Sequence, residues 1–435
     1  MSRRAAARLV ATAVCWVSVL GIAAQGAAAA GTPPGSSTSA AATRAGTGAA
    51  GPPRDLPVTA AALYAPQTGQ ILYSVNVNRR LPIASTTKLM TALVTMQHVH
   101  RLSNVFAQNN WYPAPEDSQL GLVPGERMSV HDLVEAMMLP SADDAAEDLA
   151  YNVGRGSVAR FLAMMNAEAR RLGLSHTHYT TPTGLDTPGN YSSAGDLVRL
   201  AEYDLTHSRF LARVVALRGG VVREGSRLVH IGNLNNLVRE YSWIDGVKTG
   251  HTNQAGYVLV AAGHRHGMSL ISAVLGTPSE TARDASSLSL LDYGFGSFSL
   301  RRPVRAGEVL ARPQMHDQPG TRVAVVAGRG YERLVKPGDR MRISVQVPPE
   351  LTGPLPARAV VGTATVFAGG QAVARIPLVL RQRLPAVSAL TIAAHFVTRP
   401  LTLGVIVVVA LGGLFWRGVR RRRRMDRQGG EVRTA

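Results

Sequence analysis

The sequence predicts a large α/β domain, with an antiparallel sheet and a helical subdomain, followed by a small all-β domain and one C-terminal transmembrane helix. Strand-like segments occur at both ends of residues 58–297, and helical segments lie between them. Residues 298–385 contain short apolar runs that Gly and Pro interrupt at regular intervals, the pattern of a small β domain. Residues 401–416 are apolar and include no charged side chain. A chain of 435 residues is long enough for two separate cores.

The elements of the large domain follow from hydrophobic periodicity. VTAAALYA and ILYSVN, separated by PQTGQ, predict a β-hairpin. Residues 86–99 are apolar on nearly every face of a helix, which is typical of a buried helix. Amphipathic segments continue to about Leu217 and predict a mostly helical stretch. From Gly246, GVKTG, GYVLVAAG and MSLISAVLG predict consecutive antiparallel strands, and residues 279–293 a helix that covers the sheet.

The N-terminus indicates secretion. Three arginines precede an apolar stretch, residues 9–24, and a run of small residues ends near Ala30. This pattern predicts a signal peptide over residues 1–30, cleaved after the alanines. Residues 31–57 consist largely of Gly, Pro, Ser, Thr and Ala and predict a flexible linker. The only cysteine, Cys15, lies in the apolar stretch, so the mature protein has no disulfide, cysteine metal site or cysteine nucleophile.

The C-terminus predicts a membrane anchor. At about 1.5 Å per residue, the sixteen residues of 401–416 span about 24 Å, so a helix over 401–419 is needed to approach a hydrocarbon core of roughly 30 Å. A buried helix of a soluble domain is the alternative. Arg420 to Arg424 follow at once, and the positive-inside rule then places the tail, residues 420–435, in the cytoplasm. The rest of the chain is expected on the extracytoplasmic side of the cell membrane.

The formal charge of +19 does not indicate nucleic acid. Arginines cluster at the chain ends, the central portion is closer to balance, and no aromatic-basic surface motif accompanies them. A basic run beside an apolar segment is more typical of membrane orientation.

Lysine is used at three positions only, Lys88, Lys248 and Lys336. Arginine keeps its proton in a protein, whereas a desolvated lysine can act as a base. In STTK, Ser85 and Lys88 are three residues apart and share a helix face, which places an amine within reach of a weakly nucleophilic hydroxyl. An N-cap serine beside an incidental lysine is the alternative interpretation.

A second candidate motif is PSADDAAEDLA, in which Ser141 and Asp143 lead from a loop into a helix. Ser141 and Asp144 would equally form a variant of the capping box. A third is DGVKTGHT on a predicted edge strand, where Lys248 supplies charge and Gly250 gives a substrate room to approach the backbone. A strand that runs into a turn would also look like this.

Together, and in this order, the three motifs resemble the penicillin-interacting serine enzymes. Neighbouring segments narrow the resemblance: YAPQTGQILYS, RRLPIASTTKLMTAL, TPTGLDTPGNYSSAGDL, NLNNL and DGVKTGHTNQAGYVLVA are similar to those of the D-alanyl-D-alanine carboxypeptidases among the low-molecular-mass penicillin-binding proteins. The resemblance covers residues 58–297 and, more weakly, the β domain and anchor. It implies the penicillin-binding-protein/β-lactamase-like transpeptidase fold and removal of the terminal D-alanine from peptidoglycan stem pentapeptides, with β-lactams as acylating inhibitors and no cofactor or metal.

The resemblance also implies roles for individual residues. Ser85 is acylated, Lys88 is its base, and Ser141 with Lys248 relays a proton to the departing D-alanine. The backbone N–H groups of Ser85 and His251 form an oxyanion hole. The expected substrate-binding residues are Asp143, Thr249, Gly250, His251 and Arg283, with Thr249 and Arg283 on the terminal carboxylate.

One position departs from the family pattern, which has asparagine where this chain has Asp143. An amide donates and accepts, whereas a carboxylate only accepts and favours protonated Lys88. Two alternatives therefore stay open: a wall-associated scaffold or penicillin-binding protein with a weakened site, and a β-lactamase, although no ExxLN segment is found for its deacylating glutamate. The sequence leaves open whether water or an amine receives the acyl group, and which third residue the stem carries.

Overall fold

The computed structural model describes residues 51–316, 318–386 and 400–428. The predicted signal peptide, most of the linker and the last residues of the tail lie outside the described residues. The N-terminal part of the described chain has a central sheet with the order β2-β1-β9-β8-β7. Its strands are β1 (Ala60–Ala65), β2 (Gln70–Val75), β7 (Ile244–Thr252), β8 (Gly256–Arg265) and β9 (Met268–Thr277).

The central sheet joins distant parts of the chain, as the sequence predicts. All four pairings are antiparallel, and β1 lies against β9 with Ala62 opposite Ala273. The predicted hairpin is β1 and β2, and the predicted meander is β7, β8 and β9. β7, which carries Lys248, is an edge strand.

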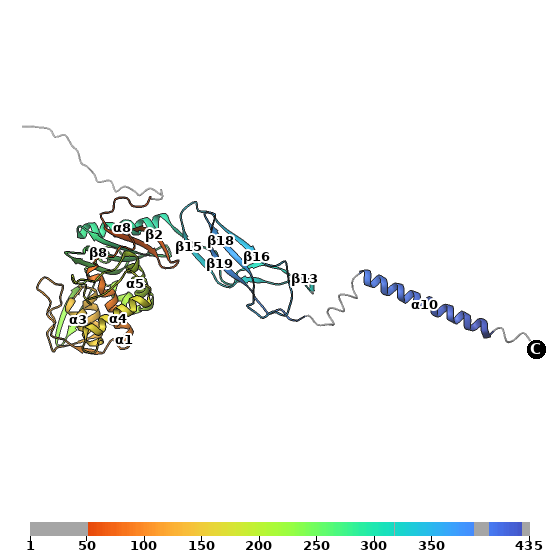
Figure 1. Ribbon diagram of the computed structural model, residues 1–435, viewed down its shortest axis with the longest axis horizontal. Coiled ribbons are helices and arrows are strands. Elements are labelled where there is room, and N and C mark those ends of the chain that lie inside the picture. Colours follow the sequence, from red (N-terminus) through yellow and green to blue (C-terminus); the bar gives the residue numbers. More distant parts are fainter. Residues whose placement is uncertain (1–50, 317, 387–399, 429–435) are drawn as a thin grey trace, which may run out of the picture. The chain divides into compact units, whose positions relative to one another are not determined.

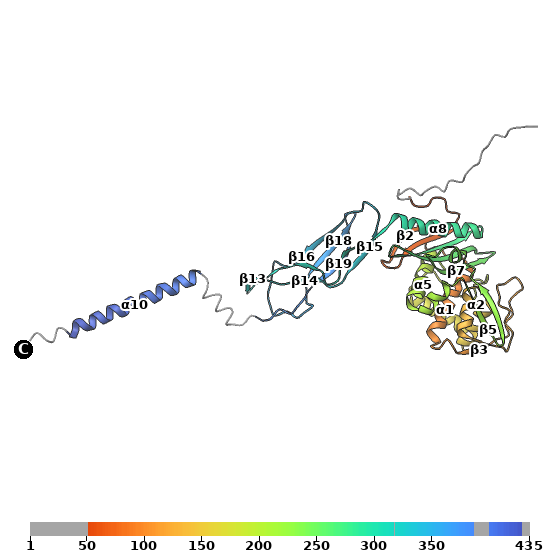
Figure 2. The same ribbon diagram turned by 180° about the vertical axis from the view of Figure 1, so that it is seen from behind.

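Helices cover the two faces of this sheet (Figures 1 and 2). α8 (Glu280–Ser297) packs on β8 and β9, and Ser279 caps it by accepting a hydrogen bond from Ala282 N. The helical subdomain lies on the opposite face. Its helices are α1 (Lys88–His98), α2 (Val130–Met138), α3 (Asp143–Val153), α4 (Val158–Arg171), α5 (Ala194–His207) and α6 (Arg209–Val215). A short α7 (Asn236–Glu240) precedes β7.

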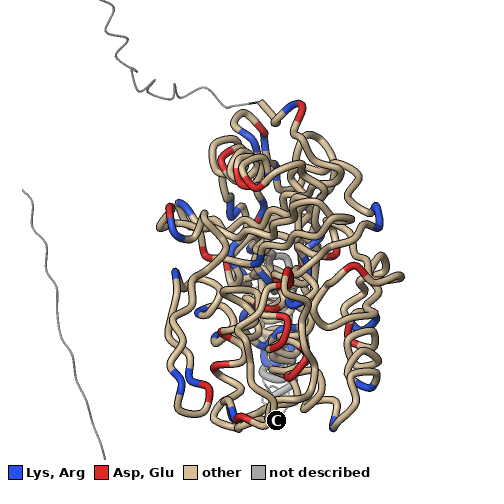
Figure 3. The backbone as a smooth tube through the Cα atoms, turned by 90° about the vertical axis from the view of Figure 1, so that its left-hand side faces the viewer, with Lys and Arg blue, Asp and Glu red and all other residues tan. Residues whose placement is uncertain are grey.

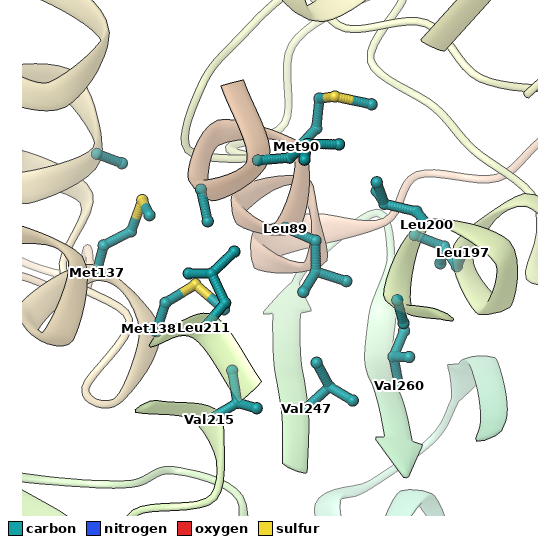
Figure 4. Close-up of a cluster of buried hydrophobic side chains, with 14 of the residues drawn as sticks. Leu89, Met90, Met137, Met138, Leu197, Leu200, Leu211, Val215, Val247 and Val260 are labelled. Carbon is teal, nitrogen blue, oxygen red and sulfur yellow. The ribbon is translucent and has the colours of Figure 1, made fainter. Parts of the chain in front are cut away.

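α1 is buried at the centre of the subdomain, as its apolar sequence predicts. Eight of its residues, Lys88 to Thr95, are buried. Figure 4 shows Leu89 and Met90 of α1 among side chains of α2, α5, α6, β7 and β8, including Met137, Leu197 and Val260. Because this core holds α1 rigidly, residues at its N-terminus have fixed positions.

The predicted mostly helical stretch is in part wrong. It contains β3 and β4, which pair with β5 and β6, beyond Leu217, in a four-stranded sheet with the order β3-β4-β5-β6. The strands are short, and their apolar residues are few, so no strand pattern stands out in the sequence. They are β3 (Val105–Ala107), β4 (Arg127–Ser129), β5 (Gly219–Glu224) and β6 (Arg227–Gly232). Between β3 and β4 runs a long loop, residues 108–126, called the 108–126 loop below.

Residues 299–380 form the all-β region that the sequence predicts. Its largest sheet has the order β11-β14-β19-β18-β16, with the long strands β18 (Val360–Ala368) and β19 (Gln371–Leu380) beside one another. Ile376, Leu378 and Leu380 supply part of its core. The remaining strands are β10 (Ser299–Val304), β11 (Val309–Ala311), β12 (Gln314–Met315), β13 (Gln318–Arg322), β14 (Val325–Ala327), β15 (Tyr331–Val335), β16 (Met341–Gln346) and β17 (Glu350–Leu351).

The apolar C-terminal segment forms α10 (Pro400–Gln428). Among the described helices, α10 is the one long and apolar enough to cross a membrane, over Leu403–Arg422, and no residue of that window is buried. Its 20 residues correspond to about 30 Å, the thickness of a hydrocarbon core.

Candidate active site

Ser85 and Lys88 meet at the start of α1. Ser85 lies in a 3-10 turn, η1 (Ala84–Thr87), and Lys88 is the first residue of the α-helix that continues it. The spacing of three brings the Lys88 Nζ within 2.8 Å of the Ser85 Oγ. The predicted pairing of hydroxyl and amine is therefore present.

The Lys88 side chain is completely buried and has three oxygen partners. Its Nζ lies 2.8 Å from the Ser85 Oγ, 2.6 Å from the Asp143 Oδ1 and 3.0 Å from the Thr183 carbonyl oxygen. These three acceptors match the three donors of an ammonium group. With a neutral amine, the Ser85 hydroxyl can instead donate to the Nζ lone pair while the other two contacts persist.

Burial and charge act in opposite directions on this pair. Burial lowers the pKa of Lys88 below its ordinary value, and the charge of Asp143 opposes that shift. For Asp143 the same burial disfavours the charged carboxylate and so raises its pKa, whereas the charge of Lys88 lowers it. Asp143 raises the pKa of Lys88, as the sequence predicts, but desolvation lowers that pKa by more. The net shift therefore favours the neutral, basic amine.

Ser141 reaches the same site in a strained conformation. It lies between α2 and α3 with φ at +67°, a region that non-glycine residues rarely adopt. Its side chain is 3% exposed, and its Oγ has no hydrogen-bond partner among the described residues. The predicted capping alternative is wrong, because Ala142 is the N-cap of α3 and no side chain caps it. Ser141 is therefore held for something other than helix capping.

β7 brings Lys248 and Gly250 against the Ser85 turn. Lys248 is buried, and its Nζ donates to the Thr249 carbonyl oxygen at 3.1 Å. Burial, followed by the charge of Lys88, holds the pKa of Lys248 well below its usual range. A Cβ at position 250 would lie 3.0 Å from the Ser85 N, so this glycine makes room for the Ser85 turn rather than only for a substrate. The segment Gly250–His251 thus lies beside the Ser85 amide.

These residues line one cleft of about 610 Å³. Ser85, Ser141 and Asp143 contribute to one side, and Thr249, Gly250 and His251 contribute from β7. The His251 ring packs on Tyr257 with 4.0 Å between centroids. All the expected site residues except Lys88 and Lys248 line this cleft. These two lysines are buried beside the residues that line it.

Arg283 also lines the cleft, from the first turn of α8. Its side chain is buried rather than lying on an exposed helix face. The guanidinium bonds to Asp284 at 2.8 Å and to Glu280 at 3.0 Å. Its Nη1 has no described partner and remains able to meet a carboxylate.

The structure adds functional contacts that the sequence reasoning missed. The Thr183 carbonyl oxygen accepts from Lys88, and a Cβ on the next residue, Gly184, would lie 1.9 Å from the Ala84 oxygen. Gly184 has a φ of +92°. The glycines of TPTGLDTPGN indicate that another segment approaches this backbone closely. The sequence does not indicate that this segment is the one around Ala84.

Asp144 is the second missed residue. Its buried carboxylate accepts backbone hydrogen bonds from Leu120, Gly121 and Leu122 of the 108–126 loop, at 2.9 to 3.1 Å. The Asp143 N also donates to the Ser118 oxygen at 2.7 Å. The start of α3 therefore fixes the loop beside the cleft.

Away from the cleft, His131, Asp132 and Glu135 of α2 have potential ligand atoms within 4.8 Å of one another. Asp132 is already engaged at the helix start, where its carboxylate accepts from the Ser129 hydroxyl at 2.8 Å. This arrangement is that of a helix N-terminus, and it assigns no metal.

Comparison with known proteins decides the family. Residues 47–279, more than half of the chain, match the profile of the peptidase S11 family, D-alanyl-D-alanine carboxypeptidase. The chain belongs to this family. It is thus a serine-type D-alanyl-D-alanine carboxypeptidase, one of the bacterial cell-wall enzymes that act on peptidoglycan peptides and are bound by β-lactams.

Individual relatives agree with the family. D-alanyl-D-alanine carboxypeptidase DacA of Escherichia coli is 31% identical over 340 residues, 73% of this chain and 81% of that protein. DacF of Bacillus subtilis is 27% identical over 330 residues, 74% of this chain and 84% of that protein. These carboxypeptidases do not favour the scaffold or β-lactamase alternatives.

Solved structures show the same fold. Penicillin binding protein 5 from Haemophilus influenzae superposes with a TM-score of 0.66 at 26% identity, covering 77% of this chain and 99% of that one. The Streptomyces K15 DD-transpeptidase superposes with a TM-score of 0.54 at 31% identity, covering 57% of this chain and 99% of that one.

Proposed function

We propose that the carboxypeptidase reaction proceeds through an acyl-enzyme on Ser85, with Lys88 as the base. The observation that carries this assignment is the 2.8 Å contact between the Lys88 Nζ and the Ser85 Oγ at the floor of the cleft. The Oγ attacks the carbonyl carbon of the penultimate D-alanine, and its proton passes to the neutral Nζ. Because burial lowers the pKa of Lys88, the amine can take this role.

Ser141 and Lys248 serve the leaving group. When the peptide C–N bond breaks, the nitrogen of the terminal D-alanine needs a proton. The unpartnered Ser141 hydroxyl, together with Lys248, relays to this nitrogen the proton that Lys88 has taken from Ser85. Water then hydrolyses the ester, which releases the shortened stem peptide and regenerates Ser85.

Backbone and side-chain donors hold the substrate. The N–H groups of Ser85 and His251 stabilise the oxyanion, a contribution of about 3 to 4 kcal/mol for each donor in other enzymes. Thr249 and the free Nη1 of Arg283 bind the terminal carboxylate. Asp143 accepts from Lys88 and lines the cleft, and Gly250 allows β7 to approach the Ser85 turn.

The domain boundaries and location belong to the same proposal. Residues 58–297 form the catalytic domain, residues 298–385 the β domain, and residues 401–419 a single membrane span. The catalytic domain lies on the extracytoplasmic side after cleavage of a signal peptide within residues 1–30. The basic tail and the apolar helix support this orientation.

Penicillin labelling tests the assignment of the nucleophile. Mass spectrometry of protein treated with benzylpenicillin is expected to find one adduct, on the peptide that contains Ser85, and Ser85→Ala is expected to abolish it. Ser208→Ala is the matched control, because Ser208 does not line the cleft and its side chain only caps α6. An adduct on another residue of active protein would refute the assignment.

Acyl transfer to an amine is a second candidate outcome, because the Streptomyces K15 protein, at 31% identity, is a DD-transpeptidase. Product analysis of a pentapeptide, with and without an added D-amino acid acceptor, separates the two. Hydrolysis predicts the tetrapeptide as the main product, and transfer predicts an exchanged C-terminal residue.

A further inference from the structure

The β region and the short segment that follows it, residues 299–386, carry an excess of positive charge. They contain fourteen lysines and arginines against five aspartates and glutamates, whereas the two kinds of charge nearly balance in residues 58–297. Figure 3 shows acidic and basic residues interspersed in the large α/β part of the chain, which faces the viewer. A local excess of this size attracts anionic partners.

The described carboxylates of the β region already have partners of their own. Glu332 bonds to Arg302 at 2.6 Å, and this is the one ion pair with an arginine among the described residues of the region. Glu308, Asp339 and Glu350 are held by backbone N–H groups or by a histidine. The remaining arginines therefore have no carboxylate partner among the described residues.

Some of these arginines gather at the end of the β region from which the chain continues to α10. Backbone hydrogen bonds bring three segments together there. Arg358 N donates to the Leu380 oxygen at 3.0 Å, and Arg381 N donates to the Ala324 oxygen at 3.2 Å. The exposed arginines of these segments, called the arginine cluster below, are Arg322, Arg358, Arg381 and Arg383.

An exposed valine lies beside this cluster. Val360 is 67% exposed, against 39% for Val345, the other exposed large apolar residue of the described β region. Val360 follows Arg358 by two residues, and it pairs with Val379, two residues before Arg381. Guanidinium groups around an apolar side chain suit a membrane surface, which offers phosphates and an apolar interior together. A soluble phosphate polymer would leave the valine in water.

The chain itself keeps this end of the β region near a bilayer. Residues 385–399 connect Leu384, the last buried residue of the region, to Pro400 at the start of α10. A connection of this length spans at most about 55 Å even when it is fully extended. Contacts that are weak by themselves become populated within such a reach, because the tether raises the effective concentration of the surface.

We infer that the arginine cluster and Val360 dock on the headgroups of anionic phospholipids, on the outer face of the membrane that α10 spans. The docking rests on the proposed membrane span and is independent of the proposed catalytic chemistry. Each arginine close to an anionic surface strengthens it. α10 then anchors the protein, and the arginine cluster holds the β region on the membrane surface.

Arginine footprinting of the full-length protein tests the docking. The protein is reconstituted into vesicles of phosphatidylcholine alone, or of phosphatidylcholine and phosphatidylglycerol in equal amounts, and treated with p-hydroxyphenylglyoxal. Mass spectrometry gives the modification of two reporters, Arg381 and Arg383, relative to Arg101, an exposed arginine of the catalytic domain. We expect the anionic vesicles to lower this ratio roughly fivefold or more, the effect of about one arginine held at the surface. Added salt should restore the ratio.

The double variant Arg358→Gln/Val360→Ser removes one charge and the exposed apolar side chain but keeps both reporters. In anionic vesicles it should bring the ratio at least halfway back to its value in neutral vesicles. Arg340→Gln/Val345→Ser makes the same changes at β16, where Met341 pairs with the opposite end of β18 from Val360. This control should keep the wild-type ratio. Unchanged modification in neutral vesicles shows that each variant keeps its fold.

Three results would overturn the docking. One is an equal ratio for the wild type in the two kinds of vesicle, and another is equal protection in the two double variants. The third is protection that requires added poly(glycerol phosphate), which would assign the arginine cluster to a soluble phosphodiester polymer instead.

Flotation of the same vesicles separates the docking from the proposed membrane span. Protein that floats with both kinds of vesicle but has equal ratios retains the span and loses the docking. Protein that floats only with the anionic vesicles loses the span and retains the docking.

Discussion

Two opposing effects, the charge of Asp143 and the burial of Lys88, determine whether Lys88, the proposed base, is protonated. Desolvation disfavours the ammonium form, whereas the carboxylate at 2.6 Å favours it. The same three-acceptor geometry therefore holds a proton at low pH and releases it at higher pH. The sequence indicated the influence of Asp143 but not its size relative to desolvation, because burial depends on how α1 packs.

Asp143→Asn should move the pH profile of acylation to lower pH. The carboxylate raises the pKa of Lys88, so its removal lowers that pKa and makes the neutral amine available at more acidic pH. Below the pKa, each pH unit of displacement gives about tenfold more base. Rate constants for penicillin acylation between pH 5 and 10 measure the effect.

Asp117→Asn should have the same kind of effect to a smaller extent. The charge of Asp117 also raises the pKa of Lys88, but less than the charge of Asp143 does. We expect a smaller displacement in the same direction. A slower Asp143→Asn enzyme with an unmoved profile would show that Asp143 acts through a substrate contact instead.

Lys248→Arg should reduce acylation although the positive charge is kept. Lys248 is fully buried, and its pKa is lowered by burial and by Lys88, so a permanently charged and larger guanidinium would be poorly accommodated. We expect the second-order rate constant for penicillin to fall roughly 100-fold or more, the range of a lost proton-transfer group. Lys336→Arg is the control, since Lys336 is exposed in the β region. Wild-type kinetics in both variants would refute the role.

At the scale of elements, the sequence predicted the sheet better than the subdomain. β7, β8 and β9 have long apolar runs, and their pairing follows from short turns. β3 and β4 have three residues each and are paired across the 108–126 loop, so no local pattern marks them. The motifs predicted Ser85, Ser141 and Lys248 as candidate site residues. Asp144 could not be predicted to hold the 108–126 loop, because its hydrogen-bond partners lie more than twenty residues away in the sequence.

Asp144→Asn should loosen the 108–126 loop. The carboxylate accepts from Leu120, Gly121 and Leu122, and an amide offers one oxygen and directs an NH₂ group at the remaining donors. Leaving these partly buried donors unpaired should destabilise the fold by roughly 1 kcal/mol, the lower end of the cost of a buried unpaired donor. Hydrogen exchange should accelerate in residues 118–123, and acylation should slow.

Asp132→Asn is the control for this loop, because it removes a carboxylate from the start of α2 that contacts Ser129 and His131 instead. Its exchange pattern in residues 118–123 should match the wild type. If Asp144→Asn leaves that pattern unchanged too, the loop is held by other contacts, such as the hydrogen bond that Glu224 accepts from Val123 N at 2.7 Å.

At the scale of the whole molecule, the positive charge lies mainly in the C-terminal part of the chain, in the β region and next to the apolar helix α10. The basic residues that the sequence suggested were concentrated at the chain ends also occur throughout the β region, for example at Arg301, Arg333 and Arg342. Arg301 and Arg333 lie directly opposite one another on β10 and β15. The positive charge of the chain is thus shared by the β region and the segment around α10.

Truncation after Leu384 should release a soluble protein that penicillin still acylates. Leu384 is buried and pairs with Leu355, so this end point keeps the last contact of the β region while removing α10. The helix exposes Val408, Leu411 and Phe415, an apolar surface that a bilayer would cover. Truncation after Arg424 is the control and should stay in the membrane fraction, because it keeps the whole apolar window. Recovery of the Leu384 truncation in membranes after a high-salt wash would place the anchor elsewhere, whereas its release with unchanged acylation would show that α10 tethers the enzyme without contributing to the active site.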